Sequence, residues 1–192
     1  MSVAGRGAKR QPLDFYETPS AFCDAIVRVI PVRSPDAMVL DAGAGSGAWG
    51  AALKQVYPDV WLEGIDIDER PVPSSGAYDE WHPNQDFLAS TQESLGTYDV
   101  ILGNPPFSLA EEFVRHAHTL LAPGGVVAFL LRLNFLEGKQ RGEKLWKELP
   151  LSVLHVFSSR PSFTGDGRTD ASAYALFVWA KGHHGKFTGG WL

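Results

Sequence analysis

Short apolar runs alternate with helical or turn-rich segments along most of the chain, and this alternation restricts the fold more than any other feature. The clearest apolar runs lie at 38–42, 60–65, 98–102 and 126–133. Parallel strands need long crossover connections, usually helices, whereas antiparallel strands can be joined by short turns. The alternation therefore predicts an α/β fold with a mostly parallel sheet and helices on both faces.

Helical spacing is clearest near residue 25. Apolar residues from Phe22 to Ile30 recur at i, i+3, i+4 and i+7, which places them on one face of a helix. Thr18 stands where a helix cap belongs, and Pro19 stands in the first turn. A helix is also expected after the glycines that follow residue 42, with Trp49, Ala52, Leu53 and Val56 on one face, and a charged helix over 139–149.

The second half of the chain adds a further helix and a hairpin. Ser108 and Glu111 have the spacing of a capping box, which predicts a helix over 108–121. The runs 153–157 and 174–179 have no helix between them, so an antiparallel pair is expected. With a weak strand just before residue 86, the predicted sheet has seven strands.

Length and composition limit the class of protein. The chain has 192 residues, a net charge of −5 and 44% hydrophobic residues, which suits one domain with a full core. We expect a flexible basic tail at 1–13 and a single catalytic domain over 14–192. The single cysteine, Cys23, argues against a disulfide scaffold and is consistent with a cytoplasmic location. The sequence shows neither a secretory signal nor a membrane span, and its acidic balance argues against bulk-charge coating of nucleic acid.

Residues that follow the apolar runs are candidates for a binding site, because ligands bind at the carboxyl ends of strands in such sheets. Asp41 is followed by glycines at 43, 45 and 47, which let the backbone turn tightly and approach a ligand. Asp66 follows the second run and can accept hydrogen bonds from ribose hydroxyls. Asp86 and Phe87 follow the weak strand, and Asn104-Pro105-Pro106-Phe107 follows the next.

Each of these residues also has a plainer interpretation. The glycines can serve packing or a dinucleotide site, and Asp66 can cap a helix. Asp86 can be a surface loop residue, Asn104 a turn residue before two prolines, and Phe107 a core residue. Because these residues follow successive strands of the predicted sheet, they are expected at one edge of it, and this favours a binding site.

The spacing of the motifs resembles the S-adenosylmethionine-dependent methyltransferases. Gly-x-Gly-x-Gly after Asp41 resembles their motif I and differs from the dinucleotide pattern Gly-x-Gly-x-x-Gly. The run 104–107, preceded by 98–101, resembles the (Asp/Asn)-Pro-Pro-aromatic motif of enzymes that methylate exocyclic or amide nitrogens. Residues 15–19 are similar to the segment that precedes motif I in adenine-N6 enzymes, and 160–179 to the tail of small phage-type adenine methyltransferases. The order of motifs is that of the gamma-type group.

The resemblance implies a class I methyltransferase that transfers a methyl group from S-adenosylmethionine to adenine N6 in DNA. Adenine N6 is a poor nucleophile because its lone pair is conjugated into the ring. By resemblance, the Asn104 side-chain oxygen and the Pro105 carbonyl accept hydrogen bonds from the two amino hydrogens and orient the lone pair. Pro105 and Pro106 stiffen this backbone, and Phe107 offers a face on which a flipped or unpaired base can stack.

The same resemblance implies a set of cofactor-binding residues. Those near the methionine part are Asp41, Gly43, Gly45, Tyr16 and Thr18, of which Thr18 can instead be only a helix cap. Those near the nucleoside part are Asp66 for the ribose, Asp86 for the adenine amino group, and Phe87 beside it.

Substrate contacts beyond this site are less defined. The segment 132–147 carries a local charge of 5 − 2 = +3 and has two interpretations, a phosphate-binding surface or a solvated helix face. His116 and His118 do not share a helical face, and no metal site is expected. No target-recognition region is recognised, so either specificity is short or relaxed, or a partner or second copy supplies it.

Two other functions remain open at this stage. The same chemistry on RNA (guanine N2 or adenine N6) or on a protein glutamine would use the same motifs. A nucleic-acid-binding module on an inactive methyltransferase fold is the third hypothesis. The intact glycine loop, Asp66 and the 104–107 motif count against it.

Overall fold

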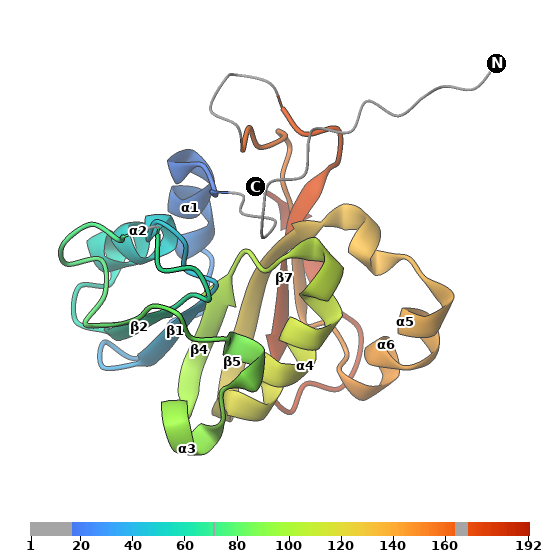
Figure 1. The fold of residues 1–192 in the computed structure, drawn as a ribbon. Coiled ribbons are helices and arrows are strands. Elements are labelled where there is room, and N and C mark those ends of the chain that lie inside the picture. The colour runs from blue at the N-terminus through green and yellow to red at the C-terminus, as the bar shows by residue number, and fades with distance from the viewer. Residues whose placement is uncertain (1–16, 71, 164–168) are drawn as a thin grey trace.

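The computed structural model describes residues 17–70, 72–163 and 169–192, and its centre is a single mixed sheet (Figure 1). The eight strands are β1 (Met38–Ala42), β2 (Trp61–Ile65), β3 (Glu80–His82), β4 (Tyr98–Gly103), β5 (Leu121–Arg132), β6 (Val153–Val156), β7 (Tyr174–Ala180) and β8 (Thr188–Trp191). Their order is β3-β2-β1-β4-β5-β7-β6-β8. Neighbours from β3 to β5 are parallel, and β7 is antiparallel to both β5 and β6. The predicted fold class is confirmed, including the C-terminal antiparallel hairpin.

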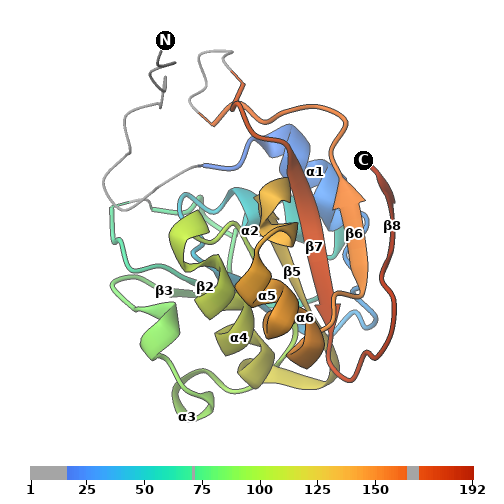
Figure 2. The same cartoon turned by 90° about the vertical axis from the view of Figure 1, so that its right-hand side faces the viewer.

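The sheet has one strand more than the seven expected. β8 pairs in parallel with β6 at the sheet edge (Figure 2). Its four residues are all exposed, so the sequence has no apolar alternation there to indicate a strand. A Cβ added at Gly189 would lie 2.4 Å from the Leu154 carbonyl oxygen, so this pairing depends on a residue without a side chain.

Helices cover both faces of the sheet (Figure 2). One face carries α1 (Ser20–Val27) and α2 (Ala48–Val56), and the other carries α3 (Gln92–Leu95), α4 (Ala110–Leu120), α5 (Lys139–Glu143) and α6 (Leu145–Glu148). Successive residues of β5 alternate between the two cores: Val127 and Phe129 pack on the α4 side, and Ala128 and Leu130 on the α1 side. A strand buried on both faces reads as a continuous apolar run, which is why β5 was predictable.

Two predicted helix caps are wrong. Helix α1 has Pro19 as its N-cap, and Thr18 instead turns inward, where its hydroxyl oxygen accepts a hydrogen bond from Trp49 Nε1 at 3.0 Å. The capping box of Ser108 and Glu111 does not form, because the chain first makes a tight 3-10 turn closed by Leu109 N–H to the Pro106 carbonyl. Helix α4 therefore begins two residues later than predicted, at Ala110.

The predicted helix over 139–149 is divided into α5 and α6. The break lies at Lys144, whose φ of −120° and ψ of −74° are outside the helical region, and Gly142 weakens the preceding turn. The predicted tail at 1–13 lies outside the described residues. Among the residues that are described, no helix has both the length and the apolar character needed to cross a bilayer.

Candidate active site

A cavity of about 180 Å³ lies at the carboxyl ends of β1, β2 and β4. Eight of the residues predicted for the site line it: Thr18, Gly43, Gly45, Asp66, Asp86, Phe87, Asn104 and Pro106. They come from five separate segments of the chain. The structure thus brings the glycine loop, both acidic positions and the Asn104 motif to one cavity.

The remaining predicted residues are placed differently. Pro105 and Phe107 do not line the cavity, although Asn104 and Pro106 beside them do. Asp41 also lies away from it, with no exposed surface. Tyr16 falls outside the described residues.

Asp41 lies in the core below the glycine loop. Its Oδ2 accepts a hydrogen bond of 2.6 Å from the Tyr78 hydroxyl, and burial raises the pKa of the Asp41 carboxyl to about 7. Because Asp41 is enclosed, it can support the loop without touching a ligand in the cavity.

The glycine loop has a backbone that other residues rarely adopt. Gly43, Gly45 and Gly47 have φ values of +83°, +54° and +84°. A Cβ added at Gly43 would meet no protein atom within 4 Å, so it would project into open space at the cavity wall. A Cβ at Gly47 would lie 2.8 Å from the Cβ of Pro73. The loop therefore leaves room for a ligand on one side and packs closely on the other.

Asp66 holds the loop in place. Its carboxylate accepts hydrogen bonds from Gly45 N–H at 2.7 Å and from Asp68 N–H at 2.8 Å. The carbonyl of Ile65 accepts from the N–H groups of Gly43 and Ala44. Burial raises the pKa of the Asp66 carboxyl above its ordinary value. The end of β2 thus fixes the loop that follows β1, and it presents a carboxylate to the cavity.

The opposite wall is formed by residues 86 and 87. Asp86 Oδ1 accepts from Leu88 N–H at 2.9 Å, which starts a short 3-10 turn at Phe87–Ala89. Phe87 is buried, and its ring centroid lies 5.0 Å from that of Phe113 on α4. The turn is therefore anchored in the core while Asp86 stays at the cavity.

The position of Asn104 depends on Gly103, the residue before it. Gly103 has a φ of +149°, and a Cβ there would lie 2.6 Å from the Ala42 carbonyl oxygen. Only glycine allows β4 to approach β1 this closely. Asn104 therefore leaves the sheet directly beside the glycine loop and lines the same cavity.

Phe107 lies beside the cavity, against the ends of β5 and β7. The guanidinium of Arg132 lies 4.4 Å from its ring centroid, and the ring of Tyr174 lies 5.6 Å away. Arg132 Nη2 is 3.3 Å from Asp170 Oδ2, which also accepts a hydrogen bond of 3.0 Å from the Tyr174 hydroxyl. One face of Phe107 is thus covered, and the positive charge of Arg132 is paired within the protein.

Sequence reasoning missed several residues of this site. The hydroxyl of Ser46 donates to the Glu17 carboxylate, which ties the segment before α1 to the glycine loop. Trp49 lines the cavity and holds Thr18, yet its position on the apolar face of α2 indicates only packing. Tyr78 lies in a stretch with no strand or helix pattern, so no sequence signal points to its bond with Asp41.

A comparison with known families decides the classification. Residues 23–147 match the family described as "Methyltransferase small domain". The chain belongs to this family. Its match includes the glycine loop, Asp66, Asp86 and the 104–107 motif.

Curated relatives of this small-domain methyltransferase are known from bacteria. Ribosomal RNA small subunit methyltransferase C of Pasteurella multocida is 36% identical over 106 residues, covering 50% of this chain and 31% of that protein. Trans-aconitate 2-methyltransferase of Deinococcus radiodurans is 31% identical over 124 residues, covering 62% of this chain and 47% of that protein. The chain thus spans less than half the length of either relative.

Solved structures share the fold of this methyltransferase domain. A structure from Listeria monocytogenes described as a class I S-adenosylmethionine-dependent methyltransferase superposes with a TM-score of 0.72 at 14% identity, covering 98% of this chain and 68% of that chain. A type I restriction-modification methyltransferase subunit from Streptococcus thermophilus gives 0.70 at 16% identity, covering 88% and 45%. At these identities the likeness shows the fold.

The methyl donor of class I methyltransferases is S-adenosylmethionine, and the cavity suits it. The open space beside Gly43 admits a ligand against the backbone, and carboxylates follow both β2 and β3. Carboxylates accept hydrogen bonds from hydroxyl and amino groups, which a ribose and an adenine supply.

Proposed function

We propose that this domain transfers a methyl group from S-adenosylmethionine to an exocyclic amino nitrogen of a nucleic-acid base, with adenine N6 in DNA as the first candidate. The observation that carries the proposal is the position of Asn104, at the end of β4 and in the same cavity as Gly43 and Asp66. A side-chain amide beside a methyl-donor site is suited to hold an amino group.

The chemistry that S-adenosylmethionine supplies when bound is an electrophilic methyl group on a sulfonium sulfur. Asn104 Oδ1 and the Pro105 carbonyl would accept hydrogen bonds from the two amino hydrogens of the base. These bonds would turn the nitrogen lone pair toward the methyl group. An amide is neutral, so Asn104 would act through positioning and its dipole, and the proton that the methylated nitrogen loses would pass to water.

Cofactor contacts follow from the cavity walls. Asp66 would accept from the ribose hydroxyls and Asp86 from the adenine amino group, with Phe87 beside the ring. Gly43 and Gly45 would hold the methionine part, and Tyr16 and Thr18 would close the pocket near its carboxylate. Asp41, enclosed below the loop, would act as a positioning residue.

The target base would stack on Phe107. Because Arg132 covers one face of that ring, the base would either take the opposite face or replace the guanidinium. Tyr174, at the start of β7, is buried and supports the Phe107 ring from within the core. Stacking of this kind contributes about 1–3 kcal/mol per base.

A ribosomal RNA base is the second candidate target. It is favoured by the curated relatives, seven of which are named as ribosomal RNA small subunit methyltransferase C. The two candidates differ in the kind of nucleic acid, with guanine N2 or adenine N6 as the target in RNA, and both would use Asn104.

The deciding experiment incubates the purified chain with methyl-labelled S-adenosylmethionine and with DNA, ribosomal RNA or protein, and identifies the modified product by mass spectrometry. We expect N6-methyladenine in DNA, and Asn104→Ala should abolish it while cofactor binding persists. Label in ribosomal RNA would select the second candidate. Label in protein, or nucleic-acid binding without any transfer, would refute the proposal.

A further inference from the structure

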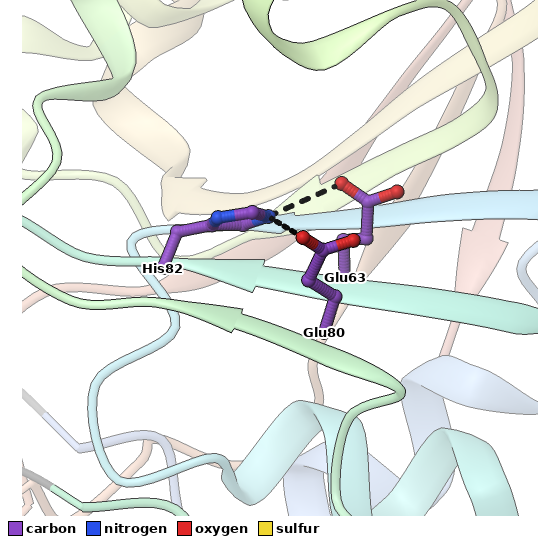
Figure 3. A group of neighbouring side chains, drawn as sticks. All are labelled: Glu63, Glu80 and His82. Carbon is purple, nitrogen blue, oxygen red and sulfur yellow. Dashed lines mark ion pairs between the residues drawn. The ribbon is translucent and has the colours of Figure 1, made fainter.

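Two carboxylates and an imidazole meet on one face of the sheet edge (Figure 3), and none of the three residues lines the cavity described above. Glu63 of β2 is the direct register partner of Glu80 on β3. His82 lies two residues further along β3, and side chains two residues apart in a strand point to the same face. The parallel register therefore brings the three side chains together, although their sequence spacing gives no metal-binding pattern.

The two distances from His82 to the carboxylates are close to those between the ligands of a small divalent cation. His82 Nε2 lies 3.4 Å from Glu63 Oε2 and 3.7 Å from Glu80 Oε1, and the three ligand atoms all lie within 4.8 Å of one another. Ligands at zinc distances in a tetrahedral arrangement are about 3.3–3.6 Å apart. Nε2 of His82 is buried and makes no hydrogen bond within the described residues.

Hydrogen bonds from two neighbouring side chains fix the orientation of the buried Glu63 carboxylate, as is typical of carboxylates that bind metals. Its side chain is 9% exposed, its Oε1 accepts from Trp61 Nε1 at 3.0 Å, and its Oε2 accepts from the Tyr98 hydroxyl at 2.7 Å. Metal-ligating carboxylates are themselves hydrogen-bonded by neighbours, which fixes their orientation. Across the described ranges, no lysine or arginine forms an ion pair with this buried charge. A buried carboxylate is costly unless a positive charge accompanies it.

We infer that Glu63, Glu80 and His82 bind a divalent cation, with Zn²⁺ as the ion that best suits one imidazole and two carboxylates. The site joins the edge strand β3 to β2. It also reaches the cavity through the backbone, because Asp66 N–H donates to the His82 carbonyl at 3.1 Å and Gln85 N–H donates to the Asp66 carbonyl. A bound cation would therefore stiffen the wall that carries Asp66 and Asp86. This inference is independent of the proposed methyl acceptor.

An imidazolium paired with both carboxylates is the other arrangement that these distances allow, and metal binding separates the two. The full chain is freed of metal with a chelator and dialysed against Zn²⁺, and bound metal is measured by mass spectrometry. Co²⁺, which absorbs visible light when tetrahedral, reports the geometry. Glu80→Gln suits the test because that side chain is 53% exposed, and His82→Gln removes the imidazole. His184→Gln, at an exposed histidine, is the matched control.

We expect one Zn²⁺ per wild-type chain, a rise in Tm on zinc addition, and affinity losses of about tenfold or more in Glu80→Gln and His82→Gln. His184→Gln should bind as the wild type does. If His82→Gln does not fold, Glu80→Gln alone carries the test. The inference is overturned if the wild type takes up no stoichiometric zinc, or if Glu80→Gln retains wild-type affinity.

Discussion

Asp41 is energetically unusual, because its carboxyl group has no exposed surface and accepts one hydrogen bond, from Tyr78, among the described residues. Burial raises its pKa from an ordinary 3.8 to about 7. The folded chain therefore binds this proton more tightly than the unfolded chain. The resulting stabilisation is fully present below about pH 4 and is lost as the pH rises to about 7.

Asp41→Asn should remove this pH dependence, because the amide is uncharged at every pH and its oxygen can still accept from Tyr78. Relative to the variant, the wild type should lose free energy of unfolding on the order of 4 kcal/mol between pH 4 and pH 8. Urea denaturation of both proteins across this range measures the difference. Asp59→Asn, at an exposed position, is the control, and parallel curves for the wild type and Asp41→Asn would contradict the prediction.

Asp66 combines a structural role, as acceptor for two backbone N–H groups, with the binding role that we propose for it. Asp66→Asn leaves one acceptor oxygen for two backbone N–H donors, those of Gly45 and Asp68, so the glycine loop should loosen. We expect S-adenosylmethionine to bind about tenfold or more weakly, measured by isothermal titration calorimetry. Asp24→Asn is the control, because Asp24 is exposed on α1 and does not line the cavity, so the variant should keep wild-type affinity. Equal losses in the two variants would show that Asp66 has no special role.

At the scale of elements, the close approach of β4 to β1 depends on Gly103. In Gly103→Ala the Cβ would lie 2.6 Å from the Ala42 carbonyl oxygen at a φ of +149°, so the strands must separate. We expect a loss of free energy of unfolding on the order of 2–4 kcal/mol, measured by urea denaturation. Gly142→Ala is a control in which the opposite sign is expected. A Cβ there meets nothing within 4 Å, and alanine in helix α5 should raise the free energy of unfolding by about 0.5–1 kcal/mol. A tolerated Gly103→Ala would mean that β1 and β4 can move apart freely.

Elements with their own apolar pattern were predictable from the sequence. β1, β2, β4 and β5 are buried on both faces, and the hydrophobic run itself reports this. β8 was not predictable, because its pairing depends on the backbone of β6 and leaves all four side chains exposed. The caps of α1 and α4 were wrong because contacts from distant or proline-restricted segments, Trp49 and Pro106, override the local preference.

In the candidate site too, some positions were predictable from the sequence and others were not. Strand ends on one edge predict which loops meet, and Gly43, Asp66, Asp86 and Asn104 do line one cavity. The enclosure of Asp41 by Tyr78 depends on where the loop after β2 folds back, 37 residues along the chain, and no local pattern encodes it. The Arg132 guanidinium over Phe107 likewise depends on β5 lying beside β4.

Across the whole molecule, a net charge of −5 must be reconciled with the polyanionic substrate that we propose. The basic segment 132–147 is the local exception, but three of its cations already have partners. Arg132 pairs with Asp170, Lys139 with Glu143, and Arg141 donates to the Phe135 carbonyl. Phosphate contacts from this segment are therefore expected mainly from the exposed Lys144 and Lys147.

Binding of duplex DNA at several salt concentrations tests this distribution of charge. Each phosphate contact contributes about −0.9 to the slope of log affinity against log salt, so neutralising both lysines (Lys144→Gln with Lys147→Gln) should make the slope shallower by about 1.8. Fluorescence anisotropy between about 50 and 200 mM salt measures the slopes of wild type and variant. Lys186→Gln, exposed in the segment before β8 at the far edge of the sheet, should leave the slope unchanged. A wild-type affinity that does not respond to salt would assign 132–147 to the solvated surface, and recognition would then depend on the base contacts at Asn104 and Phe107.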